Sequence, residues 1–253
     1  MGSPVVLKDP SGLRAYDMVG ESSVDDKETS TEFPRREYAK PSRYIPIPRL
    51  SMTNAAYWLF LGSFYPVSKS VLALVNYKKN SKVDKGENST KNRLINDQLS
   101  GDGKKLTTGD LFKYGFYNLS HNGCEAIAVH NAKVLANYDS TLSDTIFDFE
   151  TSNAEVGYGA LGSDPRLIGL VLLREKVSFD AIKSIDDIGK NGTYIISYWE
   201  EEGKIIHTIT YKDGVFYNLR CNGSSTSFDN LTNLEKSKLY DGFIYGYIIY
   251  DNA

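Results

Sequence analysis

Apolar and polar residues alternate in short blocks along the second half of the chain, and the blocks differ in period. In residues 118–135 a polar Ser-His-Asn-Gly segment gives way at Cys124 to a run rich in Ala, Ile and Val, so we expect a helix to begin there. Other stretches are rich in β-branched and aromatic residues, which favour strands. The expected helices cover residues 124–135, 166–174 and 179–188, and the expected strands cover 191–199, 204–211, 215–220 and 242–250. This mixture predicts an α+β fold.

The stretch after residue 203 has the pattern of a β-hairpin. Asp213-Gly214 stands between two strand-like runs and is typical of a tight two-residue turn. With that turn, His207 and Asn218 become diagonal neighbours on one face of the hairpin. A three-residue turn would move Asn218 to the opposite face.

The first 50 residues are polar and contain several prolines, so they can bury little surface. We expect residues 1–50 to form an extended or partly disordered arm before a single domain of residues 51–253. A mobile arm is the simpler interpretation. The alternative is a pro-segment that binds in a cleft of the same chain.

Two apolar runs follow the arm, and Pro66 and several polar residues separate them. We interpret residues 51–77 as two short buried segments and expect no membrane span. Residues 78–105 are mostly polar and charged, which predicts a loop with one short helix.

Composition narrows the classes of function. The 29 basic and 32 acidic residues nearly balance and form no basic stripe, which argues against nucleic acid as a partner. Three histidines and two cysteines show no metal-ligand spacing, so we expect no metal and no cofactor. The first residues lack the pattern of a signal peptide, which favours the cytoplasm, although secretion stays open if an export signal has been removed.

Cys124 is the candidate nucleophile, because the start of a helix stabilises a negative charge and can lower a thiol pKa below its usual value of about 8.5. Among the possible bases, His121 lies in the same loop, and His130 points about 120° around the helix from Cys124. Both are expected to face solvent or the edge of the core. His207 is left as the base. The alternative is a purely structural Cys124, either buried or bridged to Cys221.

These residues resemble a papain-like cysteine peptidase. The resemblance rests on Asn118 six positions before the cysteine, Gly123-Cys124 opening a helix, and His207 followed by Asn218 across a hairpin. It covers roughly residues 105–250. It is closest to the bacterial branch that includes the bacteriocin-leader (double-glycine) peptidases.

The resemblance implies a helical half that carries Cys124, packed on an antiparallel sheet that carries His207. It implies a catalytic Cys-His-Asn triad of Cys124, His207 and Asn218, with Asn118 completing the oxyanion hole. Its activity would be hydrolysis of an amide bond in a peptide or protein substrate through a thioester. Two alternatives keep the fold: an amidase or acyltransferase, and a catalytically silent module that binds peptides.

The chain departs from the family at three positions. Glu125 follows the cysteine where the family usually has Gly or Trp, and Asn118 is one methylene shorter than the commoner Gln. Asp213 competes with Asn218 for the role of third triad member. The departures bear on specificity and on the third residue more than on the pair of Cys124 and His207.

Overall fold

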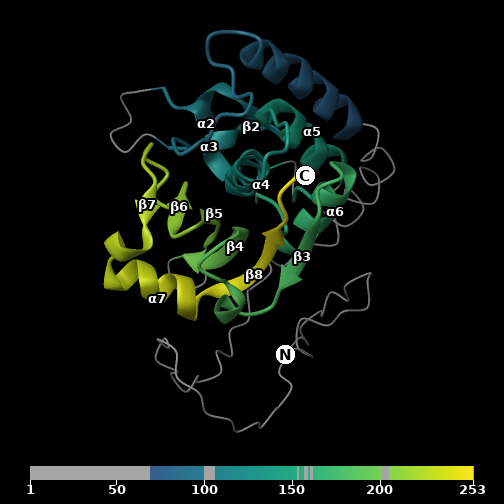
Figure 1. Ribbon diagram of the computed structural model, residues 1–253. Coiled ribbons are helices and arrows are strands. Elements are labelled where there is room, and N and C mark those ends of the chain that lie inside the picture. The colour runs from purple at the N-terminus through teal and green to yellow at the C-terminus, as the bar shows by residue number, and fades with distance from the viewer. Residues whose placement is uncertain are drawn as a thin grey trace, which may run out of the picture. The chain divides into compact units, whose positions relative to one another are not determined.

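A computed structural model describes most of the chain after residue 68. The described residues are 69–99, 106–152, 154–156, 159, 162–200 and 205–252. They combine helices with an antiparallel sheet, which confirms the α+β class (Figure 1). The predicted arm of residues 1–50 and the apolar run before residue 69 lie outside the described residues.

One six-stranded sheet organises the domain, in the strand order β3-β8-β4-β5-β6-β7 with every neighbour antiparallel. Its strands are β3 (Phe179–Ile182), β4 (Thr193–Glu200), β5 (Ile205–Lys212), β6 (Val215–Tyr217), β7 (Thr226–Ser227) and β8 (Phe243–Ile249). A separate small hairpin pairs β1 (Lys113–Tyr114) with β2 (Tyr117–Asn118). The strand predictions for β4, β5 and β8 are confirmed.

The β5–β6 hairpin has the predicted two-residue turn. Asp213 and Gly214 both have positive φ, at 49° and 88°, and Lys212 pairs with Val215. The prediction that the second strand continues to residue 220 is wrong. Asn218 has a φ of 60°, in the left-handed region and outside the extended conformation of a regular strand, and β6 ends at Tyr217. On its β5 side, strand β6 therefore pairs with only the last three residues of β5.

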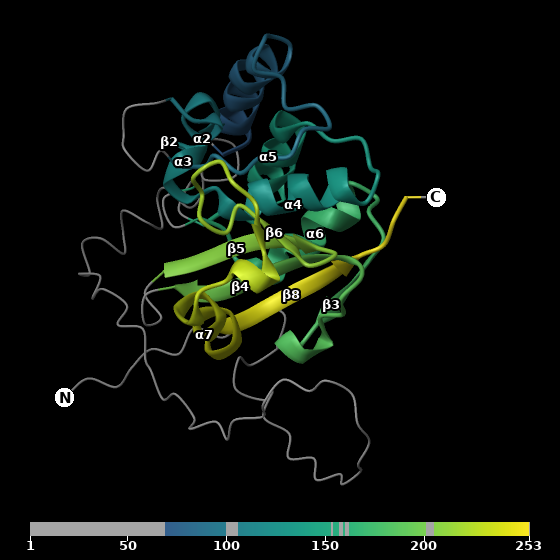
Figure 2. The ribbon, with the colours of Figure 1, turned by 60° about the vertical axis from the view of Figure 1, so that its left-hand side comes forward.

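The helices cover both faces of the sheet. They are α2 (Thr108–Leu111), α3 (Leu119–Asn122), α4 (Cys124–Leu135), α5 (Leu142–Thr151), α6 (Ile168–Arg174) and α7 (Asn233–Asp241), together with a helix over residues 69–84 and three 3-10 turns, η1 (Pro165–Leu167), η2 (Ile185–Asp187) and η4 (Phe228–Asn230). Figure 2 shows α4, α5 and α6 on one side of the sheet and α7 on the other. No helix among the described residues is long and apolar enough to cross a membrane.

Helix α4 is the centre of the helical layer, and every residue from Cys124 to Lys133 is buried. Gly123 precedes it as the N-cap and donates its N–H to the Leu119 carbonyl at 2.9 Å. A Cβ at Gly123 would lie 2.1 Å from Leu119 Cδ1, so only glycine allows α3 and α4 to meet this closely. This tight junction fixes the position of Cys124.

Two sequence predictions are wrong here. Residues 179–188 form strand β3 and the η2 turn, and β3 pairs with β8 along its whole length. A short apolar run has the same pattern in a strand and in a helix, so the partner strand decides. Residues 69–84 form one helix that continues into the predicted loop, and Val71 and Leu74 are more than half exposed rather than buried.

Candidate functional site

Cys124 is the first residue of α4, as predicted, and its side chain is 6% exposed. The thiol donates to Glu125 Oε2 at 3.4 Å and lies 4.0 Å from the Ile206 carbonyl oxygen. The backbone N–H of Thr208 also points at the sulfur. Cys124 therefore contacts the β5 backbone on both sides of His207.

The expectation of a lowered thiol pKa is wrong in the free protein. Burial raises the pKa of Cys124 well above its usual value, and the charge of Glu125 raises it further. The N–H of Thr208 acts in the opposite direction but does not offset these effects. At rest the cysteine is a neutral thiol.

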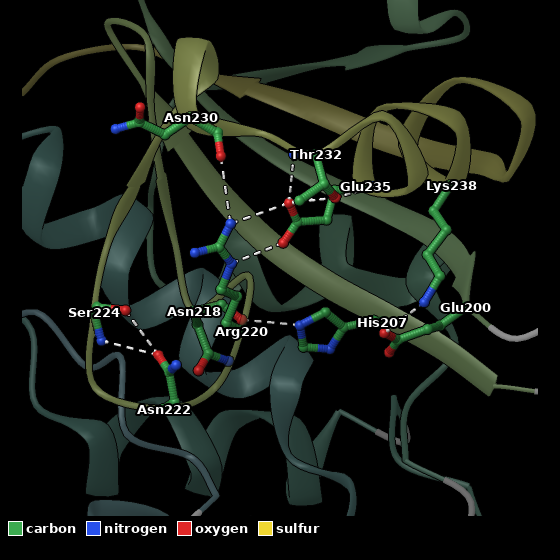
Figure 3. Close-up of polar contacts among 10 residues, drawn as sticks. All are labelled: Glu200, His207, Asn218, Arg220, Asn222, Ser224, Asn230, Thr232, Glu235 and Lys238. Carbon is green, nitrogen blue, oxygen red and sulfur yellow. Dashed lines mark hydrogen bonds and ion pairs between the residues drawn. The ribbon is translucent and has the colours of Figure 1, made fainter. Parts of the chain in front are cut away.

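His207 lies on β5 and is also buried. Its ring packs edge-on against Tyr198 of β4, the residue with which it pairs across the sheet. Its Nε2 lies 2.9 Å from the Asn218 carbonyl oxygen (Figure 3). A carbonyl can only accept, so Nε2 carries the proton and Nδ1 is the basic nitrogen of the neutral ring. Burial lowers the pKa of His207 and favours this neutral form.

Asn218 is next to His207, but the predicted contact through its side-chain amide is wrong. The left-handed backbone of Asn218 turns its main-chain carbonyl toward the imidazole. Its side-chain Nδ2 instead donates to Gln98 Oε1 at 2.9 Å, and its N–H donates to Asn96 Oδ1 at 2.7 Å. The hairpin prediction missed Gln98 and Asn96, because they lie in a polar segment without a motif and meet Asn218 only in the folded chain.

Asp213, the alternative third member, lies in the turn between β5 and β6. Its Oδ1 accepts the Gly192 N–H at 3.1 Å. The turn is at the other end of β5 from His207, so the structure favours the Asn218 carbonyl as the group that orients the imidazole.

Asn118 is the N-cap of α3, one short helix before Cys124. Its Oδ1 accepts a hydrogen bond from the ammonium group of Lys113 at 2.6 Å. This hydrogen bond uses the amide oxygen of Asn118. The amide nitrogen, Nδ2, then points away from Lys113 and can donate to another group.

The two predicted partners are close in the fold but are not hydrogen-bonded to each other. Among the residues that the structure describes, no hydrogen bond joins Cys124 to His207. His207 Nε2 lies instead 3.6 Å from the sulfur of Cys221, whose pKa burial raises to about 12. Both cysteines are free thiols, so the structure does not contain the predicted alternative of a disulfide.

The other two histidines have no part in this site. His121 is exposed, as expected, and stacks on Tyr117. The expectation for His130 is wrong, because His130 is fully buried and bonds to Ser140 Oγ and to the Arg93 carbonyl, both at 2.8 Å. Its role is structural.

A pocket of about 440 Å³ adjoins Cys221. Its walls combine leucines with two ion pairs, one between Arg220 and Glu235 at 2.7 Å and one between Lys238 and Glu200 at 3.3 Å (Figure 3). The pairing neutralises the charges, so the pocket favours a ligand without net charge. Within the described part of the chain, no group of three or more His, Cys, Asp or Glu residues could hold a metal ion.

Comparison with known proteins adds no family to these observations. No model of a known protein family matches the chain, and no curated protein matches it significantly.

Proposed function

We propose that this protein is a cysteine-dependent amide hydrolase with a papain-like arrangement of helix and sheet. One observation carries the proposal: Cys124 opens the buried helix α4 and contacts the β5 backbone on both sides of His207. The Asn218 carbonyl supports it further, because it holds the imidazole in the tautomer whose Nδ1 can accept a proton.

The reaction is acyl transfer through Cys124. His207 Nδ1 takes the thiol proton, and the sulfur attacks the carbon of an amide carbonyl. The N–H of Cys124, which opens the helix, and Nδ2 of Asn118 stabilise the oxyanion. The imidazolium then protonates the leaving amine, and water hydrolyses the thioester to a carboxylic acid and regenerates the thiol.

This mechanism requires the thiol and the imidazole to approach each other when substrate binds. Such contacts are often long in proteins without substrate and tighten in the complex. A peptide or protein segment without net charge suits the neutral pocket beside Cys221. An amidase or acyltransferase would use the same chemistry with another acyl group or acceptor.

Mapping of a trapped thioester tests the proposal. The protein is incubated with p-nitrophenyl esters of blocked amino acids, quenched in acid and digested, and the acyl group is located by mass spectrometry. We expect it on Cys124 in the parent and in His121→Ala, and not in His207→Ala. An acyl group on Cys221 would show that Cys221, whose thiol contacts His207, is the nucleophile instead of Cys124. Absence of any acyl group would leave the silent peptide-binding module as the better interpretation.

Replacement of Asn118 tests the oxyanion hole. Loss of one donor costs on the order of 10²- to 10³-fold in kcat. We therefore expect Asn118→Ala to lower kcat by that amount with a smaller change in KM, whereas Asn118→Gln retains the amide and most of the activity. Steady-state kinetics on the best ester or peptide substrate measures both. Equal activity of Asn118→Ala and the parent would show that the hole is formed elsewhere.

A further inference from the structure

We infer that Glu125 is a positioning residue that keeps the Cys124 thiol protonated in the free protein and so restrains the proposed nucleophile. The statement that Glu125 restrains a nucleophile rests on the proposed function. The hydrogen bond between the Cys124 thiol and the Glu125 carboxyl is independent of that function.

Glu125 occupies one of the three positions at which this chain differs from the papain-like pattern that it resembles, and its carboxyl is enclosed. The side chain is 3% exposed, and its Oε2 accepts the Cys124 S–H at 3.4 Å. The backbone N–H groups of Glu125 itself and of Ser163 also donate to the carboxylate. Gly162 is also close to the carboxyl, since a Cβ added there would lie 3.5 Å from Oε1. The carboxyl is therefore held against the thiol by groups from two segments.

The electrostatic consequence follows from like charges in a buried site. A thiolate at Cys124 would stand beside the Glu125 carboxylate with little solvent to screen the two charges. The thiol also has a second, longer contact to the Ile206 carbonyl, which likewise accepts the S–H and stabilises the protonated form.

The charge of Glu125 itself changes near neutral pH, because burial raises its pKa to about 7. Below that pH the carboxyl is neutral and its effect on the thiol weakens; above it the carboxylate opposes the thiolate. The titratable groups that face the pair from other elements are Tyr114 of β1, Asp164 before η1, Tyr198 of β4, His207 of β5 and Cys221 after β6. None of these groups is a cation that would offset the carboxylate, because His207 is neutral.

The first test measures thiol reactivity in a protein with one cysteine. In Cys221→Ser, the rate of iodoacetamide labelling of Cys124 is followed from pH 6 to pH 10, with and without Glu125→Gln. We expect the midpoint to fall by about one pH unit in Glu125→Gln, which is about tenfold faster labelling at a fixed pH that lies above the Glu125 pKa of about 7 and below both midpoints. Glu150→Gln is the matched control, because Glu150 is a buried acid that bonds to Asn76 and Gly115 and has no contact with the thiol.

The second test needs no substitution at Glu125. The infrared S–H stretching band of the Cys221→Ser protein reports the hydrogen bond of Cys124 alone. We expect the band to shift with pH around the pKa of Glu125, near 7, as the acceptor changes from carboxyl to carboxylate.

Two results would overturn the inference: an unchanged labelling midpoint in folded Glu125→Gln, and an S–H band that does not move between pH 6 and pH 8. The proposed function fails separately. A lower labelling midpoint without any thioester on Cys124 would support the restraint and reject the hydrolase. A thioester on Cys124 with an unchanged midpoint would do the reverse.

Discussion

We expect Cys124→Ala to reduce kcat/KM for amide or ester hydrolysis on the order of 10⁴- to 10⁶-fold, and His207→Ala to reduce it nearly as much. The reason is that the nucleophile and its base act as one unit in the proposed reaction, so loss of either removes acyl transfer altogether. For the same reason the double variant should be no slower than Cys124→Ala alone.

The measurement is hydrolysis of the substrate that gives the most thioester, with thermal unfolding as the check on folding. Cys221→Ser is the informative comparison, because Cys221 is the thiol in direct contact with His207. A loss in Cys221→Ser as large as that in Cys124→Ala, with both proteins folded, would contradict the assignment of Cys124.

The parts of the site that sequence reasoning predicted are those that local chemistry decides. A polar loop followed by an apolar run predicts the start of α4 at Cys124, and Gly123 fits the crowded junction before it. Asp213-Gly214 fixes the register of the hairpin, because both residues adopt positive φ at low cost. From these two signals the places of Cys124 at a helix start and of His207 on a strand follow without a structure.

The parts that sequence reasoning missed depend on contacts between distant segments. The hairpin register predicts that Asn218 is near His207, but not that Asn218 leaves the strand and offers its carbonyl. That turn is stabilised by Asn96 and Gln98, which are more than 100 residues away in sequence. Burial is the second such property: a helix start alone predicts a lowered thiol pKa, whereas the packed site raises it.

Sequence reasoning also misses contacts between distant segments that stabilise the fold. A buried ion pair between helices is an example. Lys133 Nζ of α4 lies 2.9 Å from Glu175 Oε2 just after α6, with both side chains at most 7% exposed. Thr145 of α5 donates to the other carboxylate oxygen at 3.3 Å. No sequence pattern joins these residues, yet they connect the three helices that cover one face of the sheet.

Glu175→Ala should lower the free energy of unfolding by about 3–5 kcal/mol, because it leaves the Lys133 ammonium buried without its partner. For a domain of this size that corresponds to a fall of about 6–20 °C in Tm. Arg174→Ala is the control, since Arg174 pairs with Asp148 but is 44% exposed, and such a pair contributes about 1 kcal/mol or less.

The double variant Lys133→Met with Glu175→Leu separates the two possible causes of that loss. If the cost comes from an uncompensated charge, replacing both partners by apolar side chains of similar size restores most of the stability, since a buried pair gains little over apolar packing. If the double variant is as unstable as Glu175→Ala, the pair stabilises the helices by its own attraction and the hydrogen bond from Thr145. Thermal and urea unfolding of the parent, Glu175→Ala and the double variant, with Arg174→Ala as the control, followed by circular dichroism, distinguishes these outcomes.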